Sequence, residues 1–140
     1  MKCWVAVVSK EHALRGIAGG FMQACHGKAA PLKRMKTGDG FMFYCPAMTM
    51  GGAEKVQKFL GFGKVKEREP YLFEMSPDFH PFRRDIDFIP GSENAESAII
   101  SDLKNLTIKS KLRFGFFDLP PADFALISES MGLENHRRVD

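Results

Sequence analysis

The chain has 140 residues, of which 44% are hydrophobic and 26% are charged, and its formal net charge at pH 7 is +3. This length suits one domain with a sizeable core, and the composition excludes a chain that is disordered throughout. No apolar run approaches the roughly 20 residues that cross a bilayer, so we expect no membrane-spanning helix.

The cysteines predict an intracellular protein without a metal site. Cys3, Cys25 and Cys45 form no CxxC pair and leave an odd thiol. The short apolar run after Lys2 is wrongly flanked for a secretory signal. We therefore expect a cytoplasmic protein with reduced thiols and with neither a metal nor another cofactor.

The charge is distributed unevenly along the chain. Residues 1–70 contain 12 Lys and Arg against 5 Asp and Glu, whereas residues 71–140 contain 8 against 12. Such a split favours one basic face, which would suit a polyanionic partner. If the two halves interleave in space the field cancels, and charge alone leaves both readings open.

The first third of the chain predicts a strand and two short helices. Residues 2–8 favour a β-strand, and Ser9 is a suitable N-cap for a helix over residues 10–15 that Gly16 ends. Residues 18–30 are glycine-rich and irregular. Pro31 suits the first position of a second short helix over residues 31–36.

The rest of the chain is rich in short strands. We expect strands over residues 41–45, 57–66, 71–75, 84–88 and 113–117, with bends at Gly61 and Gly63. Helices are expected over residues 97–106 and over residues 118–132, where Gly132 would be the C-cap.

About six strands without regular βαβ alternation predict an α+β fold, with a curved mixed sheet or pseudo-barrel and short peripheral helices. We expect a single domain over residues 1–132 and a frayed tail over residues 133–140.

The stretch SPDFHPFRRDIDF, residues 76–88, is unusually rich in rings and guanidinium groups. Its two prolines exclude regular helix from its first half, and its second half alternates like a half-buried strand. Aromatic rings stack on nucleobases while cations hold phosphates, so the pattern predicts a binding surface.

Catalysis is not predicted by any motif. Cys25 and His26 are adjacent, whereas a thiol and its base usually meet through the fold. Asp85 and Asp87 share one face of a predicted strand, but a solvated face partly neutralised by the neighbouring arginines explains them better. The glycines match no phosphate-binding loop. We therefore expect a binding protein that is not an enzyme.

Five segments together resemble the EVE domain family, a branch of the PUA-like superfamily related to YTH domains. They are WVAVVSKEH, GGFMQACHGKAAPLKRMKTGDGFMFYCP, GFGKV, EMSPDFHPFRRDIDF and FFDLPPADFALI, and the resemblance covers roughly residues 2–131. It implies a curved, barrel-like sheet with a pocket between peripheral helices. It also implies a module that reads a modified nucleobase in DNA or RNA.

The resemblance implies pocket roles for Ser9 after the first strand, for Phe21 where relatives usually have Trp, and for Tyr44 at a strand end. Together with the aromatic residues noted in loops and at strand ends, the predicted base or ligand pocket is Trp4, Ser9, Phe21, Tyr44, Phe79 and Phe82. The predicted contacts to phosphates or to the ligand are His26, Lys28, Arg83 and Arg84. We expect these residues to converge on one concave site.

Two other functions stay open at this point. One is a small hydrolase or transferase for a nucleotide-like metabolite, with His26 or His80 as acid or base. The other is a pocket for a free small molecule, without any nucleic acid.

Overall fold

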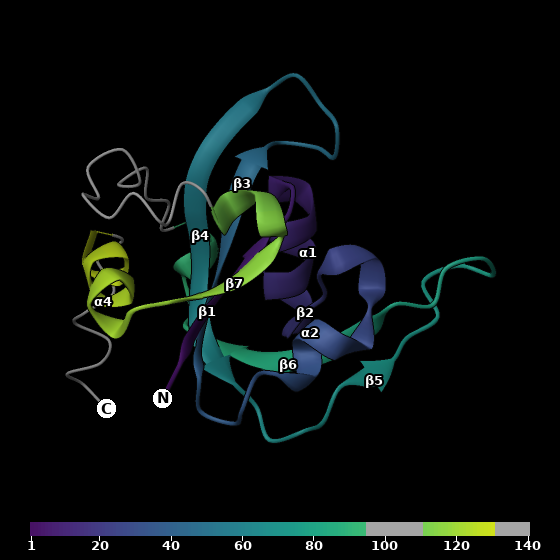
Figure 1. The fold of residues 1–140 in the computed structure, drawn as a ribbon. Helices are drawn as coiled ribbons and strands as arrows, with labels where there is room; N and C mark the ends of the chain where they lie inside the picture. Colours follow the sequence, from purple (N-terminus) through teal and green to yellow (C-terminus); the bar gives the residue numbers. More distant parts are fainter. Residues whose placement is uncertain (95–110, 131–140) are drawn as a thin grey trace.

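The computed structural model describes residues 1–94 and 111–130, and within them seven strands form one curled mixed sheet (Figure 1). The strand order is β2-β6-β4-β3-β1-β7, and β5 pairs with β6 outside this path. The strands are β1 (Cys3–Val7), β2 (Phe21–Met22), β3 (Gly40–Ala47), β4 (Lys55–Val65), β5 (Tyr71–Leu72), β6 (Phe82–Phe88) and β7 (Phe116–Leu119).

Short helices flank the sheet. The α-helices are α1 (Lys10–Gly19), α2 (Ala29–Lys33) and α4 (Pro121–Ser130), and the 3₁₀ turns are η1 (Cys25–Gly27), η2 (Ser92–Asn94) and η4 (Leu112–Phe114). The pair β1–β3 is parallel, whereas β1–β7, β3–β4, β4–β6, β2–β6 and β5–β6 are antiparallel. The predicted curved α+β sheet is confirmed.

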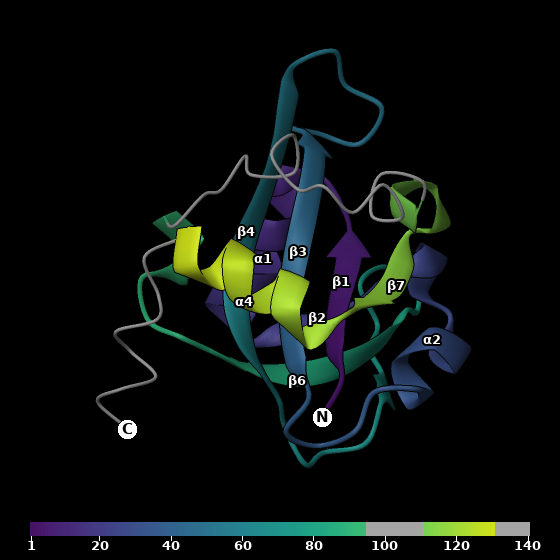
Figure 2. The same ribbon diagram turned by 60° about the vertical axis from the view of Figure 1, so that its left-hand side comes forward.

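The sheet is buried on both faces. Figure 2 shows α4 across one face of β3 and β4, with α1 behind them. Along β3, Phe41, Phe43 and Cys45 pack in the cluster on the α1 side, whereas Met42 and Tyr44 pack in the cluster that includes residues of α4. The alternation of side chains along a strand accounts for this division.

The first helix begins as predicted but ends later. Ser9 Oγ accepts a hydrogen bond from His12 N at 3.1 Å, which confirms Ser9 as the N-cap. The helix continues through Gly16 to Gly19, and Gly20 with φ 74° forms the left-handed C-cap. Gly16 instead permits close packing, because a Cβ there would lie 2.6 Å from Phe21 O. The prediction that Gly16 ends the helix is wrong.

Several boundaries differ from the prediction. The predicted strand 71–75 pairs only over Tyr71–Leu72, and β6 begins at Phe82, two residues earlier than expected. Residues 112–114 form η4, so β7 follows Gly115, whose φ of 76° breaks the extended chain. Helix α2 begins at Ala29, which makes Pro31 its third residue.

Some predictions lie outside the described residues: the helix over 97–106, the cap Gly132 and the tail 133–140. No helix in the described part of the chain is both long and apolar enough to cross a membrane.

Candidate binding site

A cavity of about 360 Å³, the main cavity, lies where the carboxyl ends of β1 and β3 meet the start of α1. Its wall is formed by residues 7–9, His12, residues 23–27, residues 46–47, residues 49–51, Phe79 and Gly115. Because β1 and β3 are parallel, their carboxyl ends lie at the same edge of the sheet, and the segments that follow both strands contribute to the wall. The volume is typical of pockets for small organic ligands.

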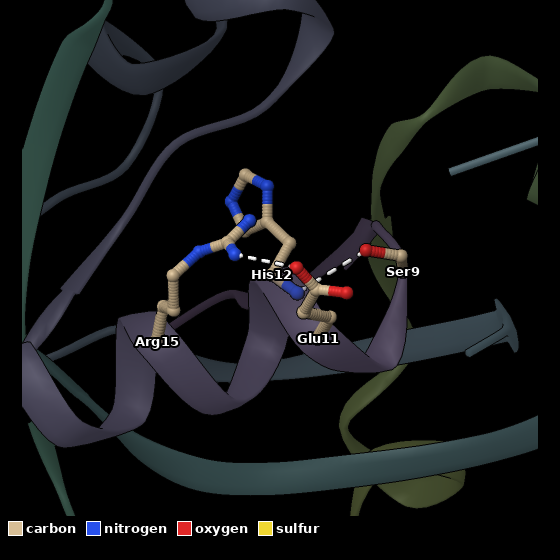
Figure 3. A network of polar contacts seen from close by, with 4 residues as sticks. All are labelled: Ser9, Glu11, His12 and Arg15. Atoms are coloured by element: carbon tan, nitrogen blue, oxygen red, sulfur yellow. Dashed lines mark hydrogen bonds and ion pairs between the residues drawn. The ribbon is translucent and has the colours of Figure 1, made fainter. Parts of the chain in front are cut away.

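The first turn of α1 supplies polar side chains to this wall (Figure 3). Ser9 caps the helix, and Arg15 Nη1 donates to Glu11 Oε1 at 2.8 Å across one turn on the exposed side. The cap and the turn together hold His12 at the wall of the main cavity.

His12 is a half-buried histidine whose pKa is lowered by its surroundings. Burial, with smaller contributions from the positive charges of Arg15 and Arg83, lowers the pKa of His12 to about 4. Its Nε2 atom is buried and has no hydrogen-bond partner among the described residues. His12 is not among the site residues predicted from the sequence, although its position three residues after the N-cap Ser9, where a strand ends, is a usable signal.

A smaller cavity of about 50 Å³, the side cavity, is lined by His12, Arg15, Phe21, Gln23, Met75 and Arg83. His12 and Gln23 line both cavities. The guanidinium carbon of Arg83 lies 3.7 Å from the ring centroid of Phe21 and 3.7 Å from that of Phe73, so the arginine is held between two rings.

The turn η1 contributes three consecutive residues with positive φ to the wall of the main cavity. Cys25, His26 and Gly27 have φ values of 52°, 60° and 81°, all in the left-handed region. Non-glycine residues in this region cost about 1–2 kcal/mol each, so surrounding contacts must hold the turn. One such contact is Pro81, which packs directly against Gly27.

The structure brings together about half of the predicted site. Ser9, His26 and Phe79 line the main cavity, and Phe21 and Arg83 line the adjacent side cavity. Lys28 is exposed and follows the wall residue Gly27, whereas Phe82 is half-buried against the α1-side core and lines neither cavity.

Trp4 and Tyr44 belong to the core instead of the cavity wall. Trp4 is 1% exposed, and its Nε1 donates to Asp39 Oδ2 at 2.8 Å while its ring stacks on Phe116. Tyr44 is 5% exposed and packs edge-on against Phe59 in the α4-side cluster. Neither residue lines the main cavity or the side cavity, so the predicted convergence on one concave site does not include Trp4 or Tyr44.

Arg84 is also structural. It is 2% exposed, and its guanidinium donates to the carbonyl oxygens of Leu32, Met35 and Lys66 at 3.4, 2.9 and 3.3 Å. These bonds join β6 to α2 and to the segment after β4. The predicted phosphate contact by Arg84 is therefore wrong, because both Nη groups donate to backbone carbonyl oxygens and Nε, which has no partner among the described residues, is also buried.

Of the two histidines considered as an acid or base for catalysis, His26 lines the main cavity. Within the described chain the wall of the main cavity contains no carboxylate, and no cluster of three or more His, Cys, Asp or Glu side chains could hold a metal. His80 lies outside the wall, with Nε2 3.8 Å from Glu74 Oε1 on the surface.

The curled mixed sheet with its short flanking helices has a PUA-like fold, like that of the YTH domain and of THYN1. The model of the EVE domain matches residues 2–130. The chain belongs to the EVE domain family, which confirms the expectation from the sequence.

Known proteins agree with this assignment. A UPF0310 protein of Streptococcus mutans is 41% identical over 135 residues, which cover 96% of this chain and 99% of the relative. The MmI1 YTH domain superposes with a TM-score of 0.57 at 15% identity, over 99% of this chain and 98% of that chain. Human THYN1, in complex with 5-methylcytosine containing DNA, gives a TM-score of 0.53 at 15% identity, over 93% and 98%. Both structural similarities concern the fold alone.

Proposed function

We propose that this protein binds a modified nucleobase of DNA or RNA in the main cavity, as a cytoplasmic binding module and not as an enzyme. The observation that carries the proposal is the cavity itself. It has about 360 Å³ of space, a mainly apolar wall, and a few polar side chains from Ser9, His12, Gln23, His26 and Thr49. An apolar cleft with few convergent polar groups is the usual form of a site for a planar organic ligand.

The structural similarities support this choice of ligand. One neighbour in fold was solved with DNA that contains 5-methylcytosine, and another is a YTH domain. A base in such a cavity must leave its stack, which costs a few kcal/mol and favours a single-stranded or extruded nucleotide.

Exposed cations beside the cavity wall suit the sugar–phosphate backbone of such a nucleotide. Lys28 follows the wall residue Gly27, and Lys55 pairs across the sheet with the wall residue Ala47. Arg15 is exposed where it lines the side cavity. Positive charge at these positions would hold phosphates while the base occupies the cavity.

The test is a binding panel with fluorescently labelled short single strands of DNA and RNA, each with one central modified or unmodified base. We expect at least one modification, with 5-methylcytosine and a methylated adenine as first probes, to bind about tenfold more tightly than its parent base. Equal binding of all strands, or no binding, would contradict the proposal. Turnover of a free nucleotide that ends on His26→Ala would favour the enzyme, and binding of free nucleosides alone would favour a small-molecule pocket.

A further inference from the structure

Gln23 occupies a distinctive place between the two cavities. It lies in the GGFMQACHG segment just after β2, lines both cavities and is only 6% exposed. A buried amide has two N–H donors and an oxygen with two lone pairs, and leaving them unpaired is costly. Its contacts therefore show what a ligand can find there.

The contact with Arg83 determines the orientation of the Gln23 side-chain amide, that is, which position holds the oxygen and which the nitrogen. Arg83 Nε donates to Gln23 Oε1 at 2.9 Å. Arginine has no acceptor, so the side of the amide that faces it must be the oxygen. The amide nitrogen accordingly points elsewhere, and one of its N–H groups approaches Met75 Sδ at 3.5 Å. Among the described residues, its other N–H has no partner.

Arg83 is itself held firmly. The rings of Phe21 and Phe73 lie 3.7 Å from its guanidinium on two sides, so it has little freedom to swing away from Gln23. Phe21 comes from β2 and Phe73 from the chain after β5, which ties both segments to β6. The result is a preorganised donor at the cavity wall.

We propose that the free N–H of Gln23 donates to a hydrogen-bond acceptor on the edge of the bound nucleobase, a carbonyl oxygen or a ring nitrogen, and that Arg83 is its positioning residue. The assignment rests on the proposed function and makes it more specific, because it requires a ligand with an acceptor at this wall. His12 lies on the same two cavities with a buried, unpartnered Nε2, which marks this part of the wall as its polar end.

The first experiment follows the side-chain amide signals of Gln23 by NMR. The chain has two glutamines, so the signals are assigned with Gln23→Glu, and the exposed Gln57 serves as the internal reference. On titration with the free bases cytosine, 5-methylcytosine, adenine and N6-methyladenine, the Gln23 amide protons should shift while those of Gln57 stay in place.

The second experiment measures binding of the tightest labelled oligonucleotide from the panel. Gln23→Glu keeps an acceptor for Arg83 but removes both N–H donors, and we expect affinity to fall about tenfold or more. Gln57→Glu is the matched control for the added negative charge and should change affinity less than about twofold. Thermal unfolding of both variants checks that the fold is retained.

Arg83→Lys tests the positioning role. Lysine keeps the charge but loses the planar group between the rings, so the Gln23 amide signals should move toward those of exposed Gln57 before any ligand is added.

The outcomes separate the two claims. If Gln23→Glu binds as tightly as Gln57→Glu, or if a base shifts other cavity signals but not those of Gln23, the assignment of Gln23 is wrong and the proposed function stands. If the Gln23 amide signals have the same positions in Arg83→Lys as in the wild type, Arg83 does not position Gln23. If neither bases nor oligonucleotides bind the wild-type protein, the proposed function fails and the assignment fails with it.

Discussion

Gly27 and Pro81 pack so closely that a Cβ on Gly27 would lie 2.6 Å from the Cβ of Pro81. Gly27 is part of the wall of the main cavity, and Pro81 O accepts a hydrogen bond from Phe73 N at the base of the 73–81 hairpin. The same hairpin carries Phe79 into the wall. This one contact therefore fixes the hairpin against the turn η1.

We expect Gly27→Ala to destabilise the protein and to weaken ligand binding. The φ of 81° and the overlap with Pro81 both oppose a side chain there. Gly38→Ala is the matched control, since Gly38 has a φ of 88° but nothing within 4 Å of a Cβ. Gly38→Ala should cost about 1 kcal/mol, and Gly27→Ala about 1–3 kcal/mol more. If urea unfolding gave the same loss in the free energy of unfolding for both variants, the 73–81 hairpin would be able to move away from a Cβ at Gly27 without cost, and the prediction would be wrong.

Arg84 and Lys28 should respond in opposite ways to removal. Arg84→Ala removes the donors to the carbonyl oxygens of Met35 and Lys66, while Leu32 O keeps a hydrogen bond from Met35 N, so the free energy of unfolding should fall by about 2–4 kcal/mol. Lys28→Ala, at an exposed site, should leave stability unchanged but reduce the slope of log affinity against log salt by about 0.7 on a single strand. A stable Arg84→Ala protein with a reduced salt slope would restore Arg84 as a phosphate contact.

His12 should make stability depend on pH between its folded and unfolded pKa values. The folded pKa is about 4, below the ordinary histidine value of 6.5, so the unfolded chain binds the proton more readily between these values. Stability should therefore be full above about pH 6.5 and fall by up to about 3 kcal/mol as the pH drops to about 4. Unfolding monitored in this range should lose most of that slope in His12→Gln and keep it in His80→Gln, at an exposed site.

Asp39 should make the free energy of unfolding depend on pH in a more acidic range than His12 does. Burial alone would raise the pKa of Asp39, but hydrogen bonds from Lys36 N, Trp4 Nε1 and Lys2 N outweigh burial and lower it. A depressed carboxyl pKa contributes stability above its unfolded value of about 3.9, which is lost as the pH falls through the folded value. Because Trp4 is the single tryptophan, its fluorescence reports this unfolding directly. In Asp39→Asn the acid-dependent loss below about pH 4 should be smaller than in the wild type.

Thr49→Trp should block the main cavity without disturbing the core, because Thr49 is exposed on the loop between β3 and β4 and lines the wall. Affinity for the best oligonucleotide should fall about tenfold or more, as expected when a pocket loses its volume. Ala53→Trp places the same ring on the same loop at an exposed position outside the wall and should have little effect. If both variants bind alike, the base occupies some other site.

Local signals predicted much of the sheet. The strand at β1, its Ser9 cap and the bent strand β4 follow from propensity and glycine placement, and Gly61 indeed has a φ of 78°. The strand pattern with its glycine bends predicted a curved mixed sheet, and the family resemblance implied the same fold. The role of Gly16 escaped prediction because its close approach to Phe21 O depends on tertiary packing.

The side-chain environments were harder to predict. Strand β3 has large apolar residues on both faces, so its pattern could not tell which face Tyr44 joins. Arg84 and its neighbour Arg83 look alike in sequence, yet their alternation along β6 buries one against carbonyls and places the other between rings. Gln23 and His12 gained their importance only when the fold placed both between the two cavities.

The parallel pairing of β1 and β3 has a consequence for how such a domain can diversify. The cavity wall at this edge combines the last residues of β1 and β3 with segments that leave the sheet, including the 49–51 loop. Loops of this kind tolerate insertions and exchanges while the hydrogen-bonded ladder beneath stays intact. Grafting the corresponding loop from another member of the family should therefore reshape the main cavity and change the ligand preference expected under the proposed function, while the paired strands stay unaltered.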